Sequence, residues 1–242
     1  MPPIRQKAIL IGASSGIGAA LAVELSAAGY ELGLAARRGD RLAEVSSSLN
    51  TSCLIELIDL RAPEQAIESL RSLIQRMAGV DLIVISSGVG FENPSLVWGP
   101  EAETIAVNVT GFAAIMNVAV EHFVSRGGGH IVGISSIAAI RGHRVAPAYG
   151  ASKAFASSYL YAIRHKFAQQ KLPICVTEIQ PGFVDTAMAK GDGIFWMVSA
   201  QRAARDIMRA IRQRRSHAYV TPRWRLIAWA LRLMPDWIYN RL

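Results

Sequence analysis

The sequence of 242 residues predicts an α/β fold, a single domain with a doubly wound parallel sheet of about seven strands and helices on both faces. Two observations carry this prediction. Short apolar runs alternate along the chain with longer stretches of helical character, as expected for strands joined by helical crossovers. The runs are also continuously apolar, which is typical of parallel strands that are buried on both faces.

Strands and helices are expected to alternate from the N-terminus onward. The predicted strands are KAILIGA (7–13), YELGLAAR (30–37), CLIELIDL (53–60), DLIVISSG (81–88), HIVGISS (130–136), PICVTEIQPG (173–182) and HAYVTP (217–222). The predicted helices are an Ala-rich helix after the first strand, a helix near 41–49, helices across 63–78, 101–125 and 147–169, and a helix near 199–214. The sequence contains no internal repeat, so we expect one continuous sheet.

Composition and charge narrow the classes of function. The chain is 51% hydrophobic and 18% charged with a formal net charge of +8, so it is globular and basic. The arginines concentrate near the C-terminus, in QRRSH (213–217) and PRWRL (222–226), without a known DNA-binding pattern, so we expect no nucleic-acid partner.

The histidines never stand at metal-ligand spacing, which predicts no metal site. The N-terminus has no secretory signal, and Cys53 and Cys175 form no CxxC pair, so we expect a cytoplasmic protein.

The first predicted strand runs directly into the turn GASSGIG, which opens the first helix. Glycines let backbone N–H groups approach a pyrophosphate, and the helix N-terminus stabilises its charge. A glycine triad alone is a weak signal, with a tight structural turn as the alternative. Its place after the first strand indicates a dinucleotide site of the Rossmann type, and the missing Gly-Lys-Ser/Thr excludes a P-loop. The predicted cofactor contacts in this turn are Gly12, Ser14, Ser15, Gly16, Ile17 and Gly18.

The end of the second strand indicates which cofactor is bound. NAD enzymes usually have an acid there that binds the ribose 2′-hydroxyl, but this chain has Ala36 followed by Arg37 and Arg38. A guanidinium matches the charge of a 2′-phosphate and can bind it through two hydrogen bonds. The sequence therefore favours NADP(H) over NAD(H), with a solvated arginine pair as the alternative.

A tyrosine and a lysine stand four residues apart in APAYGASKAF (146–155). At this spacing Tyr149 and Lys153 lie on one face of the predicted helix, and alone they could be an exposed pair that stabilises it. A nearby ammonium together with an oxidised nicotinamide favours the phenolate, which lowers the tyrosine pKa from about 10 and suits Tyr149 to proton exchange near neutrality. Ser136 ends the fifth strand and could hydrogen-bond the substrate oxygen.

Together these motifs resemble the short-chain dehydrogenase/reductase family. The order Gly-x3-Gly-x-Gly, Asn108, Ser136 and Tyr149-x3-Lys153 matches the family from about residue 7 to 221, with thirteen residues from Ser136 to Tyr149. The resemblance implies that Asn108, Ser136, Tyr149 and Lys153 form the catalytic set. It also implies that Asn108 holds a water that relays protons to Lys153.

The resemblance adds further cofactor contacts. QPGFVDT (180–186) is similar to the family's loop beside the nicotinamide, and Asp59 is similar to the residue that contacts the adenine. The chain departs from the family at Ser86-Ser87-Gly88, where Asn-Ala-Gly is common, and at Ile11, where threonine is common; both positions support the cofactor rather than proton transfer. The contacts implied outside the glycine turn and the arginine pair are Asp59, Leu60, Ser87, Gly88, Tyr149, Lys153, Pro181, Gly182, Val184 and Thr186.

The predicted function is an NADP-dependent oxidoreductase that transfers hydride between the nicotinamide and an alcohol or ketone, with Tyr149 as general acid/base. A non-catalytic NADP-binding or sensing protein on the same fold is the alternative, although such proteins usually lose the tyrosine or the lysine. A sugar-nucleotide epimerase would favour a different glycine spacing and a longer chain. The resemblance also implies a homodimer or homotetramer formed through the two long helices.

The predicted oxidoreductase domain spans 1–221 and includes a substrate lid at about 186–200. Glycines around Asp192 and the apolar run IFWMV suit a lid over a hydrophobic substrate, and the start of a core helix is the alternative. His143 and Arg144, just before Tyr149, are candidates to line the substrate site.

Residues 222–242 are predicted to form an amphipathic C-terminal extension of the same domain. In a helical projection Arg225 and Arg232 share one face. A wide apolar arc lies beside it, formed by Leu226, Ile227, Ala230, Leu231, Leu233 and Met234. Arg232 and Pro235 interrupt the segment, which is too short to span a membrane. The arc predicts a cover, either a protein contact at a subunit interface or the substrate pocket, or a peripheral contact with a membrane surface.

Overall fold

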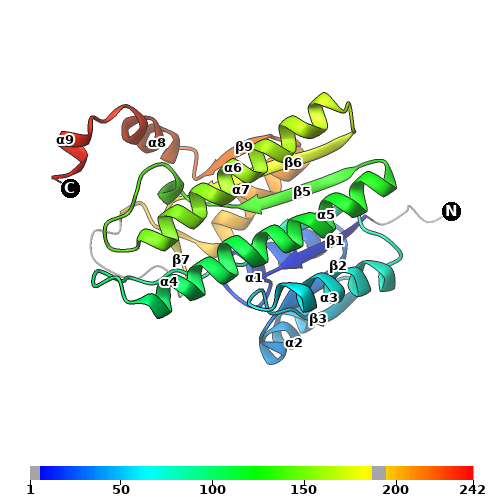
Figure 1. Cartoon of the computed structure of the whole chain (residues 1–242). Helices are drawn as coiled ribbons and strands as arrows, with labels where there is room; N and C mark the ends of the chain where they lie inside the picture. Colours follow the sequence, from blue (N-terminus) through cyan, green and yellow to red (C-terminus); the bar gives the residue numbers. More distant parts are fainter. Residues whose placement is uncertain (1–5, 187–194, 242) are drawn as a thin grey trace.

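The computed structural model describes residues 6–186 and 195–241. A seven-stranded parallel sheet runs through it in the order β3-β2-β1-β4-β5-β6-β9, which confirms the predicted fold (Figure 1). The strands are β1 (Lys7–Ile11), β2 (Glu31–Ala36), β3 (Cys53–Leu57), β4 (Leu82–Ile85), β5 (Gly129–Ile134), β6 (Ile174–Pro181) and β9 (His217–Val220). The chain builds outward from β1 to β3 and then returns to place β4 beside β1. In such sheets ligands bind at this reversal, beyond the carboxyl ends of the strands.

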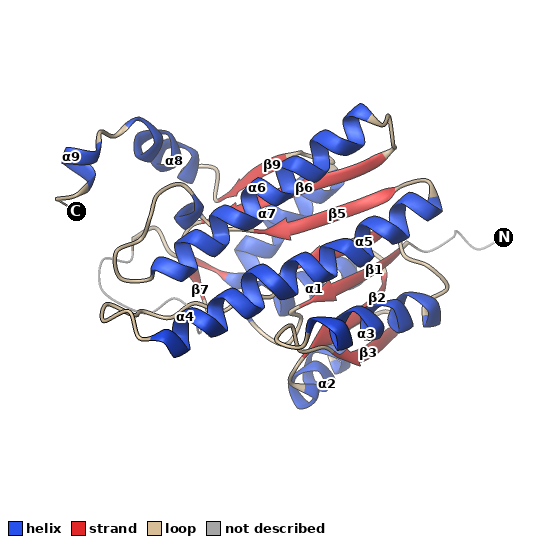
Figure 2. Ribbon diagram, viewed as in Figure 1, coloured by secondary structure: helices blue, strands red, loops and turns tan. Residues whose placement is uncertain are grey.

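The helices cover both faces of the sheet (Figure 2). They are α1 (Gly16–Ala27), α2 (Gly39–Ser47), α3 (Pro63–Arg76), α4 (Trp98–Ile105), α5 (Phe112–Arg126), α6 (Pro147–Gln169), α7 (Ala200–Arg212), α8 (Trp224–Leu233) and α9 (Asp236–Tyr239). One core cluster joins the sheet to α3, α5 and α6 through residues such as Ile115 and Leu160. The other joins it to α1, α2 and α7 through residues such as Leu21 and Ile207. The strands serve both clusters, which explains why their sequences are apolar throughout.

The helix predicted over 101–125 is longer than expected and contains a π turn. It runs from Trp98 through α4, the π turn η1 (Ala106–Gly111) and α5 to Arg126. Within the described residues it is the one helix long and apolar enough to cross a membrane. Half of its most apolar stretch is buried, and it packs against α3 and α6, so it is a core helix. The π turn places Asn108 inside the molecule, and such turns often occur at functional sites.

Two short strands that the sequence did not predict follow β6. They are β7 (Val184–Asp185) and β8 (Val198–Ser199), which pair in parallel, and α7 begins directly after β8. Strands of two residues have no periodicity that a sequence pattern could reveal. The predicted lid at about 186–200 falls largely on residues 187–194, which lie outside the described residues.

Candidate active site

The glycine turn lies at the carboxyl end of β1, against the end of β4. Gly12 has a φ of +89°, which favours glycine, and a Cβ there would lie 2.6 Å from the backbone nitrogen of Ser87. The Gly12 N–H donates to the carbonyl oxygen of Ala35 at 2.7 Å, so the turn is also fixed to β2. Ile17 packs on the core behind the turn. The structure thus brings the predicted contacts in 12–18 and at 87–88 to one edge of the sheet.

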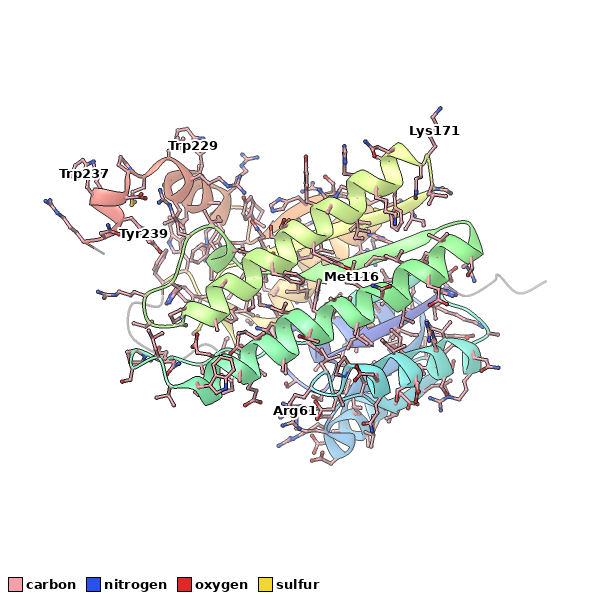
Figure 3. The ribbon with its side chains drawn as sticks, viewed as in Figure 1. Arg61, Met116, Lys171, Trp229, Trp237 and Tyr239 are labelled. Atoms are coloured by element: carbon pink, nitrogen blue, oxygen red, sulfur yellow. The ribbon has the colours of Figure 1, made fainter. Side chains whose placement is uncertain are left out.

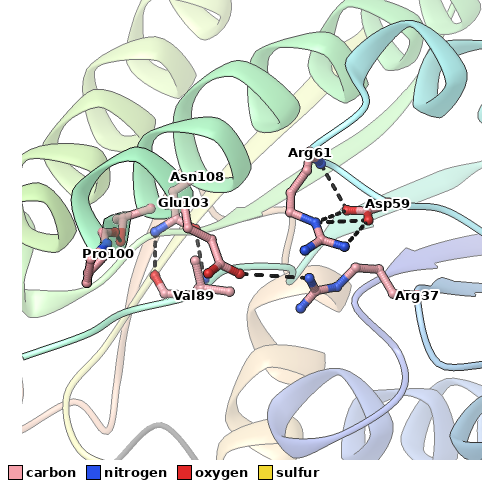
Figure 4. Close-up of polar contacts among 8 residues, drawn as sticks. Arg37, Asp59, Arg61, Val89, Pro100, Glu103 and Asn108 are labelled. Carbon is pink, nitrogen blue, oxygen red and sulfur yellow. Dashed lines mark hydrogen bonds and ion pairs between the residues drawn. The ribbon is translucent and has the colours of Figure 1, made fainter. Parts of the chain in front are cut away.

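Arg38, rather than Arg37, contacts the glycine turn. The Arg38 Nη2 atom donates to Ser14 Oγ at 3.0 Å and to Ser15 Oγ at 2.8 Å. Ser15 is the N-cap residue of α1, but its side chain makes no capping hydrogen bond, so the first N–H groups of α1 keep their capacity for an anion. Arg37 points instead toward Glu103, with 3.9 Å between Arg37 Nη1 and Glu103 Oε1 (Figure 4).

Asp59 lies beside a third arginine that the sequence analysis missed. Arg61 donates to the Asp59 carboxylate through Nε at 3.1 Å and Nη2 at 2.6 Å (Figure 4), and these hydrogen bonds hold the pKa of Asp59 below its usual value. Leu60, between them in sequence, is buried in the core. The signal for Arg61 was its place directly after the third strand, beside a predicted adenine contact.

Tyr149, Lys153 and Ser136 meet where α6 passes the end of β5. Lys153 is buried, and its Nζ donates to the carbonyl oxygen of Ile134 at 3.2 Å. The same Nζ lies 5.8 Å from the centre of the Tyr149 ring. Ser136 directly follows β5 and is also buried, and its Oγ accepts a hydrogen bond from the Ala138 N–H at 3.2 Å. The four-residue spacing therefore produces a buried lysine beside a half-buried tyrosine, not the exposed pair of the alternative interpretation.

Burial governs the protonation of this pair. It raises the pKa of Tyr149 above 10, and a hydrogen bond with Ser136 opposes that rise. The lowered tyrosine pKa is expected with an oxidised nicotinamide beside the pair and stays a prediction, since in the protein alone burial sets the direction of the shift. Burial also lowers the pKa of Lys153 to about 8. In this arrangement the Tyr149 phenol is neutral near pH 7, and the Lys153 ammonium loses its proton more readily than that of an exposed lysine.

The lowered pKa of Lys153 should make the free energy of unfolding increase with pH in the alkaline range. Between about pH 8 and pH 10 the unfolded chain binds a proton at Lys153 that the folded protein has lost, so the stability of the wild type should rise with pH. Lys153→Met removes this contribution while the other ionisable groups remain. We expect urea unfolding to show the wild type gaining about 2 kcal/mol relative to Lys153→Met across this range. An unchanging difference would mean that Lys153 has an ordinary pKa.

Asn108 fixes the loop after β4 to the catalytic helix. Its Oδ1 accepts from the Val89 N–H at 2.9 Å, and its Nδ2 donates to the Val89 carbonyl oxygen at 2.7 Å (Figure 4) and to Ser152 Oγ at 3.0 Å. The polar atoms of the side chain are thus engaged by protein groups.

Gly90, which the sequence analysis missed, lets this loop approach the tyrosine. A Cβ at Gly90 would lie 2.7 Å from Tyr149 Cδ2, and one at Gly88 would lie 3.1 Å from Lys153 Nζ. The loop after β4 therefore forms a wall of the site. His143 and Arg144 are exposed before α6, and His143 lies against Gly150.

The segment after β6 closes another side of the site. Pro181 ends β6, Val184 is buried, and the methyl group of Thr186 lies near Gly16 of the glycine turn. Gly182 packs on the indole of Trp224 so closely that a Cβ at Gly182 would lie 1.8 Å from Trp224 Cε2. The predicted contacts at 181–186 and in the glycine turn are thus brought together.

Trp224, the first residue of α8, is the centre of an aromatic cluster beside the 181–186 segment. Its ring centre lies 5.6 Å from that of Phe183, 5.2 Å from that of Phe195 and 6.1 Å from that of Trp196. Trp224 is 2% exposed, so it joins the C-terminal segment to the site. A contact between 222–242 and the rest of the protein was one of the predicted covers, but the sequence did not indicate that Trp224 makes it. Within the described part of the chain, no group of three His, Cys, Asp or Glu side chains could hold a metal ion.

Comparison with known proteins agrees with this arrangement. The family model for short chain dehydrogenase matches residues 6–193. An uncharacterised oxidoreductase of Mycobacterium tuberculosis is 32% identical over 97% of this chain and 94% of its own length. A protein of Haemophilus influenzae named as a probable NADP-dependent dehydrogenase is 32% identical over 72% of this chain and 70% of its own.

The structure of a short-chain dehydrogenase/reductase from Burkholderia phymatum, in complex with NAD, superposes with a TM-score of 0.84. It covers 94% of this chain and 93% of its own, and at 20% identity it shows a shared fold. The family match and the relative from Mycobacterium tuberculosis cover most of the sequence. The chain therefore belongs to the short-chain dehydrogenase/reductase family and is an NAD(P)-dependent oxidoreductase.

Proposed function

We propose that the protein reduces and oxidises a carbonyl/alcohol pair with NADP(H), using Tyr149 as the general acid/base. The observation that carries this proposal is the buried Lys153 one helical turn from the half-buried Tyr149, beside the buried Ser136, at the end of the sheet where the glycine turn lies. A sensing protein has no need for a buried lysine held beside a tyrosine and a serine at the end of the sheet, which makes catalysis the better explanation.

The residues at the glycine turn fit a dinucleotide. At Gly12 there is no room for a side chain, so the backbone of the turn is open to a ligand. Arg38 lies beside the N-terminus of α1, where it can meet a negative charge. Pyrophosphate would be held by the backbone of 12–18, the adenosine end by Arg37, Arg38 and Asp59, and the nicotinamide end by Lys153 and 181–186. When bound, the cofactor supplies or accepts the hydride.

The chain's own residues provide the proton and steady the charge. Reduction adds hydride to the carbonyl carbon and a proton to its oxygen. Ser136 donates a hydrogen bond to that oxygen as negative charge develops. Tyr149 gives it the proton, and burial keeps Tyr149 in the neutral form that this step requires. Lys153 lies close enough to favour the phenolate left behind, and the side chain of Asn108 holds the loop at Val89 in place.

The preference for NADP(H) rests on the arginines after β2. Arg38 already binds two hydroxyls of the glycine turn, where a 2′-phosphate could replace or join them. The name of the relative from Haemophilus influenzae supports the same choice. A hydrophobic substrate is proposed because Phe183, Phe195 and Trp224 form an apolar cluster beside the 181–186 segment.

Removing Arg38 should selectively weaken NADPH. We expect Arg38→Ala to raise the Kd for NADPH by the equivalent of about 1.5–3 kcal/mol, the cost of a hydrogen bond to a charged group, with little change for NADH. Fluorescence titration with both cofactors measures this. Arg37→Ala is the matched control because Arg37 points toward Glu103. A larger loss of NADPH affinity in Arg37→Ala than in Arg38→Ala would indicate that Arg37 binds the 2′-phosphate. Equal affinity of the wild type for NADPH and NADH would refute the preference for NADP(H).

Location and assembly follow from the same family. We infer a cytoplasmic protein, in keeping with Cys53 and Cys175, which are both free thiols. A peripheral membrane contact through 222–242 is compatible with this location. We also infer a homodimer or homotetramer built on α5 and α6, which lie side by side on one face of the sheet (Figure 1). Light scattering of the purified protein tests the assembly.

NADPH absorbance followed against ketones, aldehydes and 3-oxoacyl compounds tests the proposed reaction directly. Turnover of one carbonyl class supports an oxidoreductase. Tight NADPH binding without turnover of any carbonyl or alcohol would favour the sensing alternative.

A further inference from the structure

The helix α8 has two apolar faces, and the protein covers only one of them. Trp224 and Ala228 are buried against the body of the molecule. On the other side lies an outer strip formed by Leu226, Trp229, Leu233 and, after Pro235, Trp237. Each of these four side chains is 62–66% exposed. Trp229 and Trp237 point away from the protein at the end of the molecule (Figure 3).

Contacts on the inner side hold α8 and α9 in place. Arg141, in the segment before α6, donates from Nε to the carbonyl oxygen of Leu231 at 2.9 Å and forms an ion pair with Asp236. The Tyr239 hydroxyl donates to the carbonyl oxygen of Gly142 at 2.6 Å. These contacts fix the outer strip as a surface that faces away from the body.

The same segment is strongly cationic. Residues 222–242 contain four arginines and one acid, Asp236, which Arg141 already engages. Within the described ranges, none of the ion pairs includes Arg225 or Arg232. Both arginines are exposed, so they are available to an anion.

A pocket of about 290 Å³ lies between β9 and α8, at the edge of the outer strip, and both arginines line it. Arg225 and Arg232 line it together with His217, Tyr219 and Trp229. Guanidinium groups bind phosphate through paired, charge-assisted hydrogen bonds. Trp229 belongs both to the pocket and to the outer strip, so an anion held in the pocket would lie directly beside the apolar surface.

We propose that α8 and α9 dock on an anionic membrane, with the outer strip at the boundary of headgroups and acyl chains and a lipid phosphate in the Arg225/Arg232 pocket. Tryptophan rings favour this depth in a bilayer, while nearby arginines meet anionic lipid. A second copy of the chain suits the surface less well. A two-fold contact would bring each arginine-rich face against its own copy, where like charges repel.

Vesicle flotation tests the proposal, with full-length protein and vesicles of phosphatidylcholine with or without phosphatidylserine. We expect binding to the phosphatidylserine vesicles at low salt, weaker binding at high salt, and little binding to phosphatidylcholine alone. The double variant R225Q/R232Q should bind roughly 10- to 30-fold less well, from the attraction of two basic residues to an anionic surface. W229A/W237A should lose binding by at least ~10-fold, from the loss of inserted aromatic area.

Two control variants test whether the loss of vesicle binding is specific to this surface or follows from removing any exposed arginines or tryptophan. R212Q/R215Q removes two exposed arginines at the other end of β9, and Trp98→Ala removes a tryptophan on α4 that is 71% exposed. Neither variant should change binding more than about twofold. Absence of vesicle binding, equal losses in the controls, or a change of oligomer mass in W229A/W237A would overturn the proposal. Binding of inorganic phosphate without any binding of vesicles would also overturn it.

Discussion

Tyr149→Phe is expected to lose at least ~100-fold in kcat while it keeps its fold and its affinity for NADPH, because only the proton donor is removed. The ring still fills the space beside Gly90, and the Lys153 Nζ still binds the carbonyl oxygen of Ile134. Steady-state kinetics on any carbonyl substrate, together with NADPH titration, measures the two effects separately. Tyr161→Phe is the matched control, since Tyr161 lies on the same helix α6 and is 65% exposed.

The outcome also separates the proposed enzyme from a sensing protein. Near-normal turnover in Tyr149→Phe would remove Tyr149 from the mechanism. A loss of NADPH affinity as large as the loss of kcat would instead indicate a role for Tyr149 in holding the cofactor.

Trp224→Ala is expected to lower the free energy of unfolding by about 3–5 kcal/mol, the usual cost of truncating a buried aromatic side chain. Trp224 is 2% exposed and contacts Phe183, Phe195 and Gly182, so its truncation removes packing from all three residues. Urea unfolding measures the change. The KM for NADPH should rise as well, because Gly182 loses the surface on which it packs.

Trp229→Ala provides the matched control on the same helix. Its side chain is 66% exposed, so truncation should change stability by less than about 0.5 kcal/mol. Equal destabilisation by the two substitutions would show that α8 does not anchor through Trp224. A stable Trp224→Ala variant with an unchanged KM would separate α8 from the site.

Sequence predicted the strands well because each central strand is buried on two sides. Runs such as LIVI in β4 have no polar residue that could face water, and this excludes the alternating pattern of a half-exposed strand. Tyr149 and Lys153 were also predictable, since four residues make one helical turn. Their spacing shows that they share a face, but it does not show that the face is buried.

The parts that could not be predicted depend on contacts between distant segments. Gly182 and Trp224 lie 42 residues apart, and neither residue's neighbours in sequence indicate that the two meet. Helical projection grouped Leu226 and Ile227 in one apolar arc. The structure divides that arc, because it leaves Leu226 exposed and Ile227 half-buried. Which of Arg37 and Arg38 contacts the glycine turn likewise depends on side-chain directions after β2, which the sequence LAARR does not specify.

The position of α8 links events on its outer side to the chemistry. Its inner side holds Gly182 through Trp224, while Arg141 and Tyr239 tie α8 and α9 to the segment just before the helix of Tyr149. A ligand that shifts α8 would therefore also displace the 181–186 segment and the chain just before α6. Such coupling is reciprocal: whatever factor an outer ligand applies to NADPH affinity, NADPH applies to the affinity for that ligand. If vesicle binding at the outer strip changes the affinity for NADPH, NADPH must change the affinity for vesicles by the same factor.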